Sequence, residues 1–73
     1  MARVEVQAEV TGRVWKVEVV AGARVAADDT ILLVESMKME IPVSAPSAGL
    51  LVELLVGEGD AIESGDVVAV IEF

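Results

Sequence analysis

The hexapeptide E-S-M-K-M-E, residues 35–40, contains the side chain with the clearest chemical potential in this sequence. Lys38 lies between two methionines and is one of only two lysines in the chain, the other being Lys16. A lysine amine is a nucleophile once it has lost its proton, so it can be acylated. A two-residue turn at this place would ordinarily contain Asn-Gly or Asp-Gly, because both positions need positive φ. An unfavoured Met-Lys turn indicates that Lys38 is retained for its chemistry.

The ordinary interpretation of each residue in the hexapeptide is simpler. A lysine at a loop tip is usually a solvated charge, and Met37 and Met39 can be packing residues. Glu35 and Glu40 can be solvent-facing strand residues. Two methionines at an exposed strand end would forfeit burial, however, and their flexible thioethers suit a surface that another protein recognises.

Composition narrows the classes of function. The 73 residues allow one domain, and 55% of them are apolar although only Trp15 and Phe73 are aromatic. A core built from Val, Ile, Leu and Ala favours β-strands packed face to face. Thirteen acidic and five basic residues give a net charge of −8. Such a charge repels phosphate backbones and anionic lipids, so we expect neither nucleic acid nor membrane as a partner.

The absence of histidine and cysteine removes most catalytic repertoires. Disulfides, the usual zinc ligands and the base of a catalytic triad are all excluded. No glycine-rich phosphate loop precedes a helix, and Asp28-Asp29 is interpreted as a pair of turn residues. No secretory signal or membrane-spanning stretch is present, so we expect a cytoplasmic protein.

Sliding the sequence along itself by 37 positions, without a gap, aligns its two halves. Most aliphatic residues of one half fall on aliphatic residues of the other. Between residues 10–36 and residues 47–73, five positions are identical, pairing residue 12 with 49, 19 with 56, 22 with 59, 29 with 66 and 35 with 72. Such self-similarity predicts a doubled structural unit. We expect a single domain over residues 1–73 with half-repeats at about 10–36 and 47–73.

The elements that position the hexapeptide are predicted to be strands only. Apolar stretches and alternation predict strands near residues 4–10, 13–19, 30–34, 41–44, 50–56 and 67–72, and about eight strands in all once shorter ones are included. The apolar spacing slips at equivalent places in residues 14–19 and 51–56, which predicts a repeated β-bulge. Bulges add twist, which helps two small sheets close into a flattened barrel or sandwich.

The repeat also predicts where Lys38 lies. The offset of 37 carries Lys38 to the ends of the chain, so a two-fold relation places its hairpin at the pole opposite both termini. Lys38 would then project from an exposed tip. Pro42 cannot donate a ladder hydrogen bond and is expected on an edge strand or at a strand end. Asp28 is expected to adopt the left-handed conformation that glycine would otherwise supply.

The hexapeptide resembles the E-A-M-K-M or E-S-M-K-M signature of biotinyl domains. The T-G-R-V start, the A-P-x-x-G at residues 45–49 and the closing G-D-V-V-A-V-I also resemble the biotinyl/lipoyl family, over nearly the whole chain. The chain departs from that family at Thr11-Gly12, where Pro-Gly is common, and at two turns of the first half. The resemblance implies an all-β flattened barrel of two four-stranded antiparallel sheets with quasi-two-fold symmetry, a barrel-sandwich hybrid.

The resemblance also implies a function. Lys38 would carry biotin through an amide, Met37 and Met39 would be recognised by a biotin protein ligase, and Glu35 would belong to the flanking motif. An exposed lysine is protonated at neutral pH, so the ligase must activate the amine. The modified domain would be a non-catalytic carrier that serves the biotin carboxylase and carboxyltransferase of a biotin-dependent carboxylase, such as an acyl-CoA carboxylase. The chain resembles small free-standing biotin/lipoyl attachment proteins and also carrier domains of larger subunits.

Three alternatives remain open. Lipoate is the nearest, although lipoyl relatives tend to carry Asp-Lys-Ala, and Met37 and Met39 favour biotin. An unmodified lipoyl-like interaction module is the second, although such modules usually interrupt the barrel with long helices, and this chain has no helical signals. An enzyme in its own right has little support from these residues.

Overall fold

All regular structure in the computed structural model, which describes residues 2–73, is β-strand. The strands are β1 (Arg3–Gln7), β2 (Gly12–Val17), β3 (Arg24–Val25), β4 (Thr30–Ser36), β5 (Met39–Ser44), β6 (Gly49–Leu54), β7 (Ala61–Ile62) and β8 (Val67–Glu72). Residues 2–73 form no helix, and therefore no helix that could cross a membrane.

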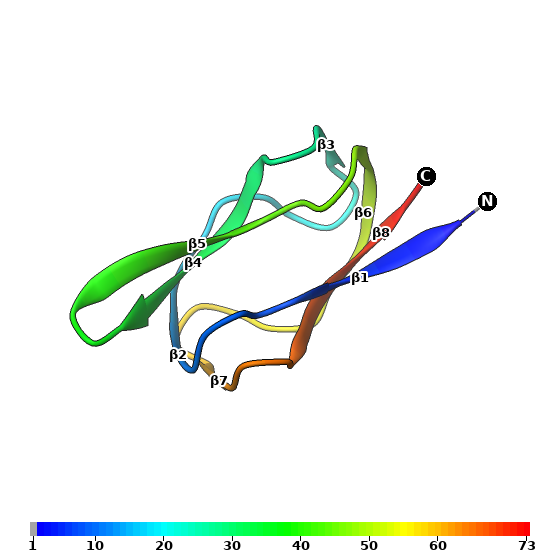
Figure 1. Ribbon diagram of the computed structural model, residues 1–73. Helices are drawn as coiled ribbons and strands as arrows, with labels where there is room; N and C mark the ends of the chain where they lie inside the picture. Colours follow the sequence, from blue (N-terminus) through cyan, green and yellow to red (C-terminus); the bar gives the residue numbers. More distant parts are fainter. Residues whose placement is uncertain (1) are drawn as a thin grey trace.

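The strands form two four-stranded antiparallel sheets, which confirms the predicted fold class (Figure 1). One sheet has the order β1-β8-β6-β3, and the other has the order β5-β4-β2-β7. A shift of 37 residues converts one order into the other, because β2 becomes β6, β3 becomes β7, β4 becomes β8 and β1 becomes β5. The boundaries of the half-repeats stay a prediction, but the two sheets can be compared position by position.

A β-bulge recurs at the same place in both sheets. The register between β2 and β4 shifts between Val14 and Lys16, and that between β6 and β8 shifts between Leu51 and Glu53, 37 residues later. Trp15 and Val52 are therefore the extra residues. The slip in apolar spacing predicted these bulges, which twist both sheets enough to pack across one core.

The core lies between the two sheets and consists of aliphatic side chains. None of its fully buried side chains in residues 2–73 is polar or charged. The largest of them are Ile31, Leu32, Leu51, Ile71, Val14, Val34 and Val68. Burial of each such side chain contributes about 1.5–3 kcal/mol. The core therefore stabilises the strands that carry the hairpin.

Three strands end earlier than predicted. β1 ends at Gln7 and not at residue 10, because the N–H of Ala8 donates to the carbonyl of Asp66 (2.8 Å) and its carbonyl accepts from Gly65 (2.8 Å). The chain thus leaves the ladder with β8 and follows the turn before it. β2 ends at Val17 and not at residue 19, and β6 ends early at the matching position.

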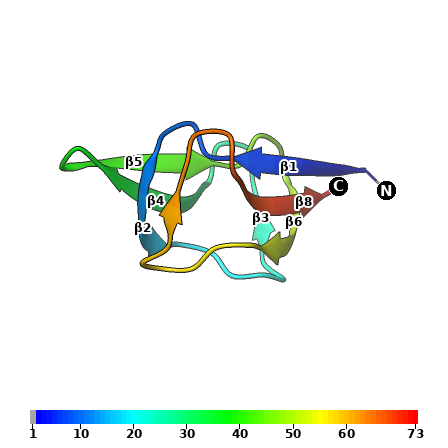
Figure 2. The ribbon, with the colours of Figure 1, turned by 90° about the horizontal axis from the view of Figure 1, so that it is seen from below.

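The molecule is elongated, with extents of 37 × 19 × 18 Å. The β4–β5 hairpin projects at one end, and β1 and β8 run toward the other end, as Figures 1 and 2 show. There Ala2 and Phe73 exchange two backbone hydrogen bonds of 2.8 Å. The hairpin is therefore at the pole opposite the paired ends, as the offset predicts.

Candidate functional site

The hairpin ends in a two-residue turn formed by Met37 and Lys38. Ser36 and Met39 are the last paired residues of β4 and β5. Met37 has φ of 52° and Lys38 has φ of 66°, so both adopt the left-handed conformation typical of a type I′ turn. This conformation costs an L-residue roughly 1–2 kcal/mol relative to glycine. The sequence predicted this unfavoured turn correctly.

The side chains of the turn face solvent. Met37 is 93% exposed, Met39 is 64% exposed, and Lys38 is also exposed. Within residues 2–73 the Lys38 amine takes part in neither of the ion pairs. Figure 2 shows the turn beyond the body of its sheet, where another protein can reach it from several sides.

Thr11 of the β1–β2 loop and Gly12, the first residue of β2, hold the base of the hairpin. A Cβ atom at Gly12 would collide with the carbonyl oxygen of Glu35 and lie 2.9 Å from Val34 Cγ1, so only glycine lets β2 approach β4 this closely. The Ser36 hydroxyl donates to the carbonyl of Thr11 (2.9 Å). These contacts fix the direction in which the turn projects.

Gly12, Thr11 and Ser36 were not among the predicted site residues. Gly12 could have been found from the sequence, because the offset of 37 matches it with Gly49, which approaches β8 in the same way. The hydrogen bond between Ser36 and Thr11 could not have been found from the sequence, since 25 residues separate the two positions and only the strand pairing brings them together.

Two carboxylates face each other below the turn. Glu35 of β4 pairs with Glu40 of β5, and Arg13 of β2 is the partner of Glu35 on its other side. The Arg13 guanidinium, however, donates to the carbonyl of Gly59 (2.7 Å). Like charges directly opposite on neighbouring strands are destabilising, so this pair is costly for the fold. Glu35, which the sequence predicted as a flanking residue of the site, is exposed on the hairpin two residues before Met37.

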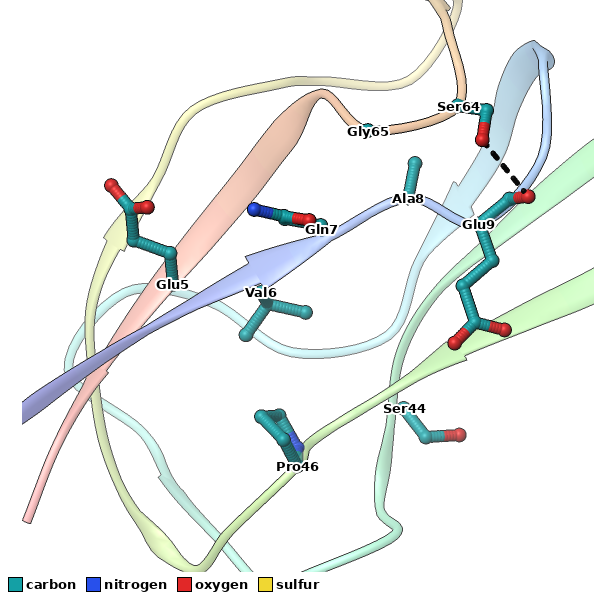
Figure 3. Close-up of a pocket in the computed structure, with 9 residues that line it drawn as sticks. All are labelled: Glu5, Val6, Gln7, Ala8, Glu9, Ser44, Pro46, Ser64 and Gly65. Carbon is teal, nitrogen blue, oxygen red and sulfur yellow. Dashed lines mark hydrogen bonds between the residues drawn. The ribbon is translucent and has the colours of Figure 1, made fainter.

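A hollow of 480 Å³ lies elsewhere, between β1, the end of β5 and the turn before β8 (Figure 3). Its lining residues include Glu5, Gln7 and Pro46, and none belongs to the turn of the hairpin. The hydroxyl of Ser64 donates to the carbonyl of Glu9 across one end (3.3 Å). Residues 2–73 also contain no cluster of three or more acidic, histidine or cysteine side chains that could hold a metal ion. At the turn of the hairpin, the reactive group is the exposed amine of Lys38.

Comparison with known proteins places this geometry in a family. The family model for biotin/lipoyl attachment, described as "Biotin-requiring enzyme", matches residues 2–71. The chain belongs to the biotinyl/lipoyl attachment family. This membership confirms the resemblance that the hexapeptide and the A-P-x-x-G segment indicated.

Relatives of similar length share much of the sequence of this biotinyl/lipoyl domain. The biotinylated protein TB7.3 homolog of Mycobacterium leprae is 45% identical over 67 residues, which cover 92% of this chain and 94% of that protein. The biotin/lipoyl attachment protein of Bacillus subtilis is 40% identical over 62 residues and 85% of each chain.

The same domain also occurs inside much larger enzymes. The urea amidolyase of Saccharomyces cerevisiae is 42% identical over 92% of this chain, but the chain spans only 4% of that enzyme. The crystal structure of the Kluyveromyces lactis urea carboxylase matches with a TM-score of 0.92 and 38% identity over 99% of this chain and 6% of that one. The biotinyl/lipoyl fold of the two sheets is thus shared with carboxylases.

Proposed function

We propose that this chain is a biotin carboxyl carrier in which biotin is joined to Lys38 by an amide bond. The observation that carries the proposal is the exposed amine of Lys38 on a left-handed two-residue turn, in a member of a biotin-requiring family. Biotin attached there would carry a carboxyl group. A biotin carboxylase would add this group to the biotin, and a carboxyltransferase would transfer it to an acceptor.

The residues of the turn fit this attachment. Acylation needs a neutral amine, an activated acyl group and space around the new amide. The exposed turn provides the space, while Lys38 has no histidine or other base beside it in the sequence. A biotin protein ligase must therefore supply both the activated acyl group and the base that accepts the amine proton. Met37 and Met39 flank the amine and are the proposed contacts with the ligase.

The fold contributes geometry to the carrier. Six residue pairs join β4 and β5, Ser36 bonds the base of the hairpin to Thr11 of the β1–β2 loop, and Gly12 lets β2 approach β4 closely. A group on a rigid tip sweeps a limited volume, so its local concentration at a docked partner far exceeds that of the same group free in solution. With no histidine or cysteine in the chain, we assign it no catalytic step.

Lipoate is a second candidate for the attached group. The Bacillus subtilis relative is named a biotin/lipoyl attachment protein, so the family membership alone fits either group. The two methionines beside Lys38 favour biotin.

The experiment that tests the proposal is intact-mass spectrometry after parallel reactions. One reaction contains biotin, ATP and biotin protein ligase, and the other contains lipoate, ATP and lipoate ligase. We expect one biotin-sized increase, after which a biotin carboxylase should incorporate radiolabelled bicarbonate into the modified protein. A lipoyl-sized increase alone would identify a lipoyl carrier. No increase in either reaction would leave an unmodified interaction module and contradict the proposal.

A further inference from the structure

The outer face of the sheet that carries the hairpin has an apolar row. Leu33 of β4 pairs with Lys16 of β2 and with Pro42 of β5, so these three residues share one face. Leu33 lies between two fully buried residues of β4, and this face is therefore the outer one. Trp15, the extra residue of the bulge, also opposes Leu33 and is 48% exposed. We call Trp15, Leu33 and Pro42 the indole row.

The matching row of the other sheet has a different character. A shift of 37 residues replaces Trp15 by Val52, Leu33 by Val70 and Pro42 by Glu5. Both Glu5 and Glu53 pair with Val70, so carboxylates flank that row on both sides. Because the same bulge forms with valine, the backbone does not require an indole there. Formation of the bulge therefore does not account for the tryptophan at position 15.

The indole row continues toward the hairpin into the carboxylates of Glu35 and Glu40. Within residues 2–73 neither carboxylate belongs to an ion pair, although Lys16, on the same face beside Leu33, pairs with Glu18 (3.5 Å). Arg13, which is next to Glu35 in register, directs a hydrogen bond to the carbonyl of Gly59. The face thus presents an exposed aromatic residue beside two carboxylates that form no ion pair, which together match a protein surface with an apolar pocket and basic residues.

We propose that this face is the docking surface of the biotin protein ligase, with Trp15 as its anchor, while Lys38 enters the ligase active site. The inference rests on the proposed function. Lys38 is five residues from Leu33, a separation of about 16 Å along paired strands. A standard interface buries about 800 Å² on each partner and spans that distance. Tryptophan is among the residues most often found at the energetic centre of interfaces.

The ligase is the partner that these observations favour. It must select Lys38 and not Lys16 on unmodified protein, so its recognition depends only on side chains of the chain itself. A carboxylase that acts later also has the attached biotin to bind. The ligase therefore depends more than a carboxylase on a recognition surface made of side chains on the same sheet as Lys38.

Steady-state biotinylation of purified protein variants tests the proposal. Trp15→Val copies the residue of the other sheet, and we expect it to raise KM for the protein at least about fivefold with little change in kcat, as for loss of an interface anchor. Trp15→Phe should recover part of the loss. Phe73→Ala is the matched control, because Phe73 is 57% exposed at the opposite pole, and it should leave KM unchanged. An unchanged KM for Trp15→Val would overturn the proposal.

A second measurement does not depend on turnover. Trp15 is the only tryptophan, so 5-fluorotryptophan labelling gives a single ¹⁹F resonance. We expect this resonance to shift or broaden when ligase and biotin are added without ATP, and a resonance unaffected by saturating ligase would contradict the docking surface. Failure of the wild-type protein to accept biotin at all would instead contradict the proposed function, so the two failures are distinguishable.

Discussion

Met37 and Lys38 both have positive φ although neither is a residue that favours it. Met37 is also 93% exposed, so it gains no burial that would offset the strain. Side chains that oppose both backbone preference and burial are typical of functional positions. The positive φ and the exposure of these residues are expected if the turn is selected for side chains that a ligase contacts.

Met37→Asn tests whether Met37 lowers the stability of the protein while it improves recognition by the ligase. Asparagine tolerates the left-handed conformation and replaces no buried group, so we expect the free energy of unfolding to rise by up to about 1 kcal/mol. In a domain of this size that corresponds to a rise in Tm of roughly 4–8 °C. At the same time kcat/KM for biotinylation should fall. Calorimetry and ligase kinetics on one sample measure both effects.

Met39→Asn is the control for that prediction. Met39 is a strand residue without positive φ, so asparagine there should lower kcat/KM without the gain in Tm. Equal Tm changes for the two variants would show that backbone strain at Met37 does not limit stability.

Asp28 carries similar strain far from the hairpin. Its φ is 72°, and the equivalent position of the second half is Gly65, with φ of 94°. The sequence predicted this conformation, because Asp28 stands at a turn where glycine is frequent in the family. We expect Asp28→Gly to stabilise the protein by a few tenths to about 1 kcal/mol, and Gly65→Asp to destabilise it. The midpoint of urea unfolding measures both, and a lower midpoint for Asp28→Gly would contradict the account.

At the scale of the elements, two glycines allow strands to approach each other closely. A Cβ atom at Gly12 would collide with the Glu35 carbonyl at the base of the hairpin, and one at Gly49 would lie 2.5 Å from the Glu72 carbonyl at the opposite pole. Both clashes are with backbone atoms, which cannot move aside as a side chain does. The glycines therefore have the same steric role in different places.

Gly12→Ala and Gly49→Ala separate stability from hairpin geometry. Each should lower the free energy of unfolding by about 1–3 kcal/mol, the usual cost of forcing an extra methyl into a packed site. Only Gly12→Ala should also shift the amide resonances of residues 35–40 and slow biotinylation beyond its effect on the folded fraction. Two-dimensional NMR spectra of the folded proteins provide the comparison. Equal slowing by both variants would show that Gly12 has no special effect on the hairpin.

Most elements could be predicted because they depend on local patterns. The alternation of apolar residues indicated the strands, the slip at residues 14–19 indicated the bulge, and the edge position of β5 followed from Pro42. The ends of β1, β2 and β6 were predicted too late; β1 ends because Ala8 forms backbone hydrogen bonds with the distant turn before β8. The bond between Ser36 and Thr11 depends on the same long-range pairing, so no local pattern contains it.

At the scale of the whole molecule, the hairpin and the paired chain ends are at opposite poles of a body 37 Å long. Attachment of a folded protein after Phe73 should therefore leave kcat/KM for biotinylation nearly unchanged, since the added mass is on the side away from Lys38. Ligase kinetics on the fusion measure this. A large loss of kcat/KM would mean that the ligase also contacts the pole of the paired ends.

The central claim is that Lys38 is the acceptor, and site-specific mass mapping tests it most directly. Wild-type, Lys38→Arg and Lys16→Arg proteins are incubated with biotin, ATP and biotin protein ligase, then digested and mapped. We expect one biotin on Lys38 in the wild-type and Lys16→Arg proteins, and none in Lys38→Arg, whose Tm should stay the same because Lys38 is exposed. Biotin on Lys16, or modification that persists in Lys38→Arg, would contradict the account.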